Sequence, residues 1–202
     1  MTPANKHIVI IYHSNYGHTR RVAHAIEQGM NAVAGVQGKA LDIAVLDDDA
    51  WTAMDRADML VFGTAVYLGG VTADFKAFMD STSKRWVERS WQGKLSAGFA
   101  NSGGLSGDKL AVLQSLCLFA MQHGMNWVGL PLVPTGSGEQ DLNRLSSFLG
   151  LMTQSLDAPP EVTPCQGDMD TAVWFGGHLA KTVLKYQNQS SKIKNGSLGA
   201  DG

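Results

Sequence analysis

The sequence has 202 residues, of which 44% are hydrophobic and 17% charged, and its formal net charge is -2. This length predicts one domain with a continuous core, and the weak acidity excludes the basic surface that a nucleic-acid partner requires. The two cysteines have no paired spacing, and residues 1–7 lack a signal-peptide pattern, so we expect a cytoplasmic protein. No apolar run approaches the ~20 residues of a bilayer span, so we also expect the protein to be soluble and to have no membrane span.

The first predicted element is a buried strand over residues 8–12, which is followed by a small polar loop and an amphipathic helix. A loop in this position can bind an anion, because unpaired N–H groups and the positive end of the helix dipole meet there. The hydroxyls of Ser14 and Thr19 add further donors. Neither Gly-x-Gly-x-x-Gly nor Gly-Lys-Ser/Thr is present, so the loop suits a phosphate monoester such as that of FMN. The alternative is a loop that only joins the strand to the helix.

Two further strands also run into loops of small residues. The buried strand 59–63 opens into residues 64–70, and the strand 95–100 runs into residues 101–107. The remaining elements of this half are also readable from the pattern. They are a strand over residues 40–46 that ends in a solvated aspartate run, a short helix over 51–58, and a helix over 72–84.

The second half of the chain contains two strong helical patterns. The first covers residues 109–123 and is stopped by Gly124, and the second covers residues 169–186 with Asp168 or Asp170 as its N-cap. A fifth strand is expected over residues 127–133. The stretch from 135 to 168 is predicted to be a long irregular connection that contains a short helix, because Leu142, Leu145, Phe148 and Leu149 have helical spacing.

Five strands that alternate with helices predict an α/β fold with a parallel sheet covered on both faces. In such sheets, ligands bind outside the carboxyl ends of the strands. The loops after the first, third and fourth predicted strands all lie at that edge. We therefore expect them to converge on one binding site.

Several separated motifs resemble those of the WrbA-type flavoproteins, which are FMN-dependent NAD(P)H:quinone oxidoreductases with the flavodoxin-like fold. These motifs are Ser14-Asn15-Tyr16-Gly17-His18, Phe62-Gly63-Thr64, Phe78-Met79-Asp80 with Trp86, Gly93-Lys94-Leu95, His123-Gly124-Met125 and Gly167-Asp168-Met169-Asp170-Thr171-Ala172. The resemblance implies a three-layer sandwich with a five-stranded sheet of order 2-1-3-4-5. The residues after Gln189 are polar and glycine-rich, so we expect one domain over residues 5–188 and a flexible tail over 189–202.

The resemblance implies specific cofactor contacts. The FMN phosphate would be surrounded by Ser14, Asn15, Tyr16, Gly17, His18 and Thr19. The isoalloxazine ring would be bordered by Val66, Tyr67, Leu68 and Gly69 on one side and by Asn101, Ser102, Gly103, Gly104 and Ser106 on the other. The family commonly has Thr-Arg-Phe where this chain has Val66-Tyr67-Leu68, so a cation and a stacking aromatic are missing beside the ring.

The resemblance also implies residues for catalysis and substrate binding. His123 would lie at the flavin edge as the catalytic residue, or else be a helix-end histidine that interacts with the helix dipole. Tyr16 would face the nicotinamide, although loop tyrosines often serve only packing. Trp86 would line the quinone site, in the family often from a neighbouring subunit, or lie in an oligomer interface. His13 and His18 lack companion ligands, so no metal site is expected.

The leading hypothesis is therefore an FMN-dependent oxidoreductase that transfers two electrons from NAD(P)H to a quinone, in a homo-oligomer that is a dimer or a tetramer. The flavin supplies the redox chemistry, and the protein binds and orients it. Two alternatives stay open. One is a flavodoxin-type carrier that takes electrons from a partner reductase. The other is a flavodoxin-like scaffold that binds other proteins without a flavin, which the residues Tyr67, Leu68 and Leu105 would favour.

Overall fold

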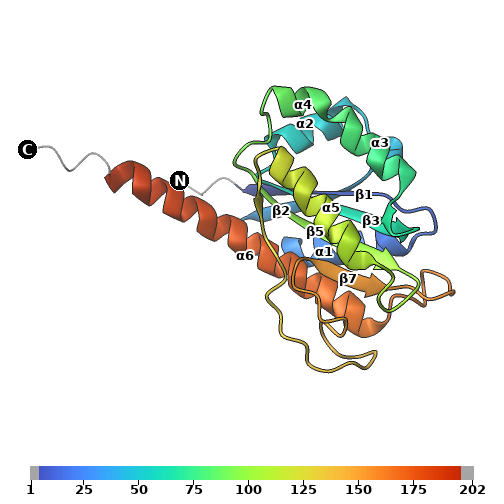
Figure 1. Ribbon diagram of the computed structural model, residues 1–202. Helices are drawn as coiled ribbons and strands as arrows, with labels where there is room; N and C mark the ends of the chain where they lie inside the picture. Colours follow the sequence, from blue (N-terminus) through green and yellow to red (C-terminus); the bar gives the residue numbers. More distant parts are fainter. Residues whose placement is uncertain (1–4, 197–202) are drawn as a thin grey trace, which may run out of the picture.

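The chain forms a parallel β-sheet between two layers of helices, as the computed structural model in Figure 1 shows; the structure describes residues 5–196. The central strands follow the order β2-β1-β3-β5-β6, which differs slightly from the predicted order 2-1-3-4-5 because β6 and β7 share the place of the fifth strand beside β5. Two more strands lie off this path: β4 pairs with β3 antiparallel, and β7 pairs with β5 parallel. The α/β, flavodoxin-like fold is thus confirmed, with more strands than the five expected.

The strands have the following bounds: β1 Lys6–Tyr12, β2 Val36–Asp42, β3 Met59–Tyr67, β4 Gly70–Val71, β5 Leu95–Ser102, β6 Asn126–Trp127 and β7 Leu151–Gln154. The second strand begins four residues before the predicted residue 40 and ends at Asp42, and the last part of the predicted strand instead forms the 3-10 turn Ile43–Val45. The helices are α1 His18–Asn31, α2 Asp48–Arg56, α3 Ala73–Ser81, α4 Ser83–Val87, α5 Lys109–Gln122 and α6 Gln166–Gly196.

Alternate residues of the buried strands feed two separate cores. In β1, Ile8 and Ile10 pack against α1 and α6, whereas Val9 and Ile11 face the layer that contains α2, α3 and α5. This alternation follows from the two-residue period of a strand, and both faces are apolar because both are covered by helices. Figure 1 shows the two helical layers on opposite sides of the sheet. None of the helices in residues 5–196 combines the length and hydropathy needed to cross a membrane.

The fifth strand differs most from the prediction. Only Asn126–Trp127 pairs with the start of β5, at Leu95 and Ser96, whereas β7 pairs with the end of β5, from Phe99 to Ser102. Residues 128–150 form an insertion between these two short strands. The helix predicted around Leu142–Leu149 is wrong: the segment forms turns there. The helical spacing of its apolar residues does not mark one buried face, because Leu149 packs against the core on the α5 side whereas Phe148 is 54% exposed.

Helix α6 begins three residues before the predicted residue 169 and continues to Gly196. The predicted boundary between domain and tail at residue 188 therefore falls inside a helix, and residues 197–202 lie outside the described part. Neither predicted N-cap is correct, since Asp168 and Asp170 both lie within the helix. Asp168 instead pairs with the guanidinium of Arg144, with Nε to Oδ1 at 2.8 Å. Of the aspartate run, Asp47 caps α2 by accepting a hydrogen bond from the N–H of Ala50 at 2.7 Å.

Candidate functional site

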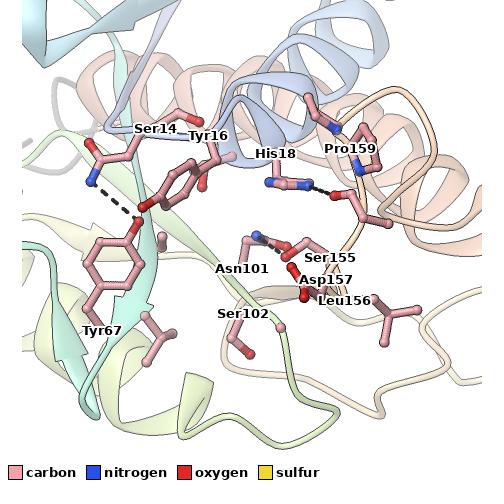
Figure 2. A pocket seen from close by; sticks show the side chains of 17 residues that line it. Ser14, Tyr16, His18, Tyr67, Asn101, Ser102, Ser155, Leu156, Asp157 and Pro159 are labelled. Carbon is pink, nitrogen blue, oxygen red and sulfur yellow. Dashed lines mark hydrogen bonds between the residues drawn. The ribbon is translucent and has the colours of Figure 1, made fainter.

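Three loops that follow β1, β3 and β5 meet at the carboxyl edge of the sheet and enclose a cavity of about 560 Å³ (Figure 2). The predicted residues on its wall are Ser14, Asn15, Tyr16, His18, Thr19, Val66, Tyr67, Asn101, Ser102 and Gly103. Their convergence is the main prediction from the sequence, and the geometry of the sheet produces it because parallel strands end at one edge. The volume lies in the range of small-molecule and cofactor sites.

The first loop provides one end of the cavity with unpaired donors. Helix α1 begins directly after Gly17, whose φ of 93° is readily adopted only without a side chain, and no side chain caps the helix. The N–H of Gly17 donates to the Ser14 hydroxyl at 3.1 Å. Within the described residues, the N–H groups of residues 18–20 have no hydrogen-bond acceptor. These groups and the helix dipole favour an anion at this end.

Two tyrosines stand at another part of the wall. Figure 2 shows Tyr16 and Tyr67 near each other, with His18 and Asn101 farther along the cavity. Tyr16 is 74% exposed and Tyr67 is 40% exposed. The side-chain amide of Asn15 donates to the hydroxyl of Tyr67 at 3.4 Å, so the first and second loops are linked. This arrangement leaves aromatic faces available to a planar ligand.

The sequence interpretation missed a fourth segment of the site, residues 155–160 after β7. The carbonyl of Ala158 accepts a hydrogen bond from Nε2 of His18 at 2.7 Å, and the carbonyl of Pro160 accepts one from Arg21 at 2.8 Å. The Ser155 hydroxyl accepts a hydrogen bond from the amide of Asn101 at 3.1 Å. This segment therefore connects the first loop, which follows β1, to the third loop, which follows β5. The signal that could have revealed it was the short run Leu151–Thr153 after Gly150, because this run is another strand that ends at the same edge.

Five of the predicted cofactor contacts lie off the cavity or only beside it. Leu68 and Gly69 form the tight turn between β3 and β4 with φ values of 49° and 80°, and Leu68 is completely exposed. Gly104 turns its carbonyl toward the interior, where the ammonium of Lys109 donates to it at 2.7 Å. Ser106 faces a second hollow on the other side of the third loop. Gly17 does not line the cavity either, but it sets the course of the first loop.

His123 lies far from the cavity in the single chain. Helix α5 starts beside Ser102 and runs back along the sheet for 14 residues, which is about 21 Å, before it reaches His123. His123 is 2% exposed, and its Nε2 lies 3.0 Å from the hydroxyl of Thr82. Burial, with a smaller effect from Arg89, lowers the pKa of His123 to about 4, so its imidazole is neutral at pH 7. The structure thus does not support His123 as the residue at the flavin edge.

Trp86 is likewise not on the cavity wall. It lies on the short helix α4 and is 46% exposed. His13, next to the first loop, is buried and points to α3, where Nδ1 lies 2.8 Å from the hydroxyl of Thr72 and Nε2 lies 3.2 Å from the carboxylate of Asp74. His13 therefore anchors the loop and does not contact a ligand in the cavity.

The fold and the cavity together define the class of flavodoxin-like, FMN-binding oxidoreductases. A relative named "Flavodoxin FldP", from Pseudomonas aeruginosa strain UCBPP-PA14, is 37% identical and covers 86% of this chain and 94% of its own length. A relative from Geotalea daltonii named "NAD(P)H dehydrogenase (quinone)" is 27% identical and covers 88% of this chain and 97% of its own length. A solved structure of a flavodoxin, WrbA-like protein from Agrobacterium tumefaciens is 37% identical, has a TM-score of 0.71, and covers 90% of this chain and 99% of that one.

The chain belongs to the NADPH-dependent FMN reductase family, whose model matches residues 7–140. This match spans the first, second and third loops of the site. The resemblance to WrbA-type proteins is thereby confirmed, and FMN is supported as the ligand of the cavity. The match ends before residues 155–160, so the fourth segment of the site lies outside it.

Proposed function

We propose that the chain binds FMN in this cavity and uses it to transfer two electrons from NAD(P)H to a quinone. The observation that carries the proposal is the pairing of two chemically different regions in one cavity. One region has unpaired N–H groups at the start of α1, and the other has exposed tyrosine rings. A phosphate suits the first region, and a flavin ring with a second planar ring beside it suits the other.

The residues of the chain fit FMN in two respects. Ser14 and Thr19 bring hydroxyls to the phosphate end without a lysine, as expected for a monoester. Leu68 and Leu105 are exposed and do not line the cavity, so they do not fill the space that the ring needs. The flavin supplies the redox chemistry when it is bound, and the protein's task is to hold and orient it. This fit disfavours the hypothesis of a scaffold without a flavin.

The test has two stages. Purified protein is incubated with excess FMN, desalted, and examined for bound flavin by its absorbance. NADH or NADPH is then added without oxygen, and we expect the flavin band to bleach and to return when benzoquinone is added. Protein that retains no FMN would refute the proposal at the first stage. Retained flavin that neither nucleotide bleaches would refute the NAD(P)H reaction alone.

A flavodoxin-type electron carrier is a second candidate, because the relative at 37% identity is named a flavodoxin. The absence of His123 and Trp86 from the cavity of a single chain is consistent with it. A carrier would accept electrons from a partner reductase but not directly from NAD(P)H, so the bleaching experiment separates the two functions.

We also propose that the chain forms a homo-oligomer, either a dimer or a tetramer. Trp86 is exposed on α4 and so is free to contact a neighbouring copy. Sedimentation velocity of the FMN-loaded protein measures the assembly state, and a monomer at micromolar concentration would contradict the proposal.

A further inference from the structure

A buried lysine lies directly behind the third loop of the cavity. Lys109, the first residue of α5, has no exposed surface. Its ammonium donates to the hydroxyl of Ser102 and to the carbonyl of Gly104, both at 2.7 Å. Within the part of the chain that the structure describes, no carboxylate lies within ion-pair distance of it. Both of its partners are therefore neutral oxygens.

The buried position of the Lys109 ammonium is unfavourable when the cavity holds no ligand. Burial of an ammonium without a counter-charge is costly, and a cation at the N-terminus of a helix opposes the helix dipole. Burial lowers the pKa of Lys109 to about 8. The carboxylate of Asp168 on α6 raises this pKa, but Asp168 is already paired with Arg144 of the insertion, whose charge lowers it again. Asp108 is the remaining neighbour with a charge, and its side chain is exposed.

The contacts of Lys109 also set the direction of the loop's backbone groups. The carbonyl of Gly104 points inward to Lys109, and the carbonyl of Gly103 accepts a hydrogen bond from the side chain of Gln154 at 3.1 Å. Because a peptide unit is planar and trans, the N–H groups of Gly104 and Leu105 point the opposite way. Among the described residues, neither N–H has an acceptor. Ser102 and Gly103 line the cavity, so the lysine, the loop and the cavity are adjacent layers.

We propose that Lys109 is a positioning residue that makes the third-loop wall of the cavity bind the reduced, negatively charged flavin more tightly than the oxidised flavin. The inference rests on the proposed binding of FMN. Hydride transfer, FMN + NAD(P)H → FMNH⁻ + NAD(P)⁺, places one negative charge on the flavin. Lys109 supplies the positive charge that the neutral, oxidised isoalloxazine ring does not need. Its role is to raise the midpoint potential of the bound flavin.

The size of the effect follows from Coulomb's law. At an effective dielectric constant of about 20, a unit charge as far as about 12 Å away changes a binding constant by a factor of about ten. For a two-electron couple, this factor corresponds to about 30 mV. We therefore expect loss of the charge to weaken binding of reduced FMN by about tenfold relative to oxidised FMN.

The variants Lys109→Gln and Lys109→Met are compared with the wild-type protein and with Lys94→Met. Lys94 is a matched control, because its ammonium also donates to backbone carbonyls and burial also lowers its pKa, but it lies at the other end of β5. The affinity for oxidised FMN is measured by flavin fluorescence, and the midpoint potential is measured by spectroelectrochemical titration. We expect both Lys109 variants to retain oxidised FMN and to have potentials lower by about 30 mV, with no change in Lys94→Met.

Unchanged potentials in FMN-loaded Lys109→Gln would overturn the inference and leave the proposed function intact. Failure of the wild-type protein to bind FMN would overturn both. If the variants do not fold, the potential of the wild-type protein is measured from pH 7 to 9.5. We expect its potential to fall by up to about 30 mV more than a constant slope would give, mainly between about pH 8 and 9, because neutral Lys109 takes up part of a proton there when the flavin is reduced. A constant slope through this range would contradict the role of Lys109.

Discussion

The hydroxyl of Thr19 offers a direct test of the phosphate end of the cavity. Thr19 lies in the first turn of α1, lines the cavity, and is 2% exposed. No hydrogen bond of its hydroxyl is found within the described residues, so the hydroxyl is available to a ligand. Thr19→Val removes this group and keeps the shape of the side chain.

The expected loss of affinity follows from one missing hydrogen bond to a charged group. Such bonds contribute about 1.5–3 kcal/mol, so Thr19→Val is expected to bind FMN about 10- to 150-fold more weakly. Riboflavin has the same ring and ribityl chain but no phosphate. Its affinity should therefore be the same in the variant as in the wild-type protein.

The assay is quenching of flavin fluorescence, with FMN and riboflavin titrated separately into each protein. Thr19→Ser restores the hydroxyl and should restore most of the FMN affinity. The thermal midpoint of each apo-protein checks that the fold is unchanged. Equal losses for FMN and riboflavin, or no loss for either, would refute the assignment of the phosphate to the start of α1.

Three further predictions concern the stability of the framework. In Gly176→Ala, the new Cβ would lie 2.0 Å from the carbonyl oxygen of Ile26, so we expect the free energy of unfolding in urea to fall by about 1–3 kcal/mol. In the control Gly177→Ala, the nearest oxygen is that of Gly29 at an ordinary 3.6 Å, so we expect no loss of stability. Equal effects of the two substitutions would contradict this packing. Asp168→Asn leaves the guanidinium of Arg144 buried without its counter-charge and should cost about 3–5 kcal/mol in the same assay, whereas a loss below about 1 kcal/mol would mean that the pair is dispensable. Burial lowers the pKa of His123 from about 6.5 to about 4, so the unfolded chain binds more protons than the folded chain between these pH values, and stability should fall by up to about 3 kcal/mol as the pH decreases from 6.5 to 4. Unfolding measured at several pH values should show a smaller decrease in His123→Gln. Identical curves for the variant and the wild-type protein would refute His123 as the source of this pH dependence.

Much of the site was predictable because it depends on short stretches of sequence. The loop from Ser14 to Thr19 could be recognised as an anion site from the order of strand, polar loop and helix. Val66, Tyr67, Asn101 and Ser102 could be assigned to the same cavity because they follow buried strands, and parallel strands end at one edge. The turn at Leu68 and Gly69 could not be foreseen, since the pairing of β4 with β3 directs these two residues away from the cavity.

Most of the residues that were misplaced or missed depend on how elements distant in the sequence are arranged in space. His123 carries a family motif, but the path of α5 places it at the opposite end of the sheet. Residues 155–160 reach the first loop only because β7 joins β5 after the insertion. The burial of Lys109 depends on its packing beneath the third loop, and an isolated lysine at the start of a helix has no such pattern in the sequence.

The sequence by itself determined the alternation of strands and helices, the α/β class and the three loops at one edge, because hydrophobic periodicity and turn residues are local properties. Only the tertiary structure decided which loop residues face the cavity, which segment closes it and which charge lies behind it. Some of these features arise from packing between residues more than 50 positions apart, such as the hydrogen bond between Asn101 and Ser155. Others, such as the contacts of Lys109 with Ser102 and Gly104, are close in sequence but depend on the conformation that the folded loop adopts.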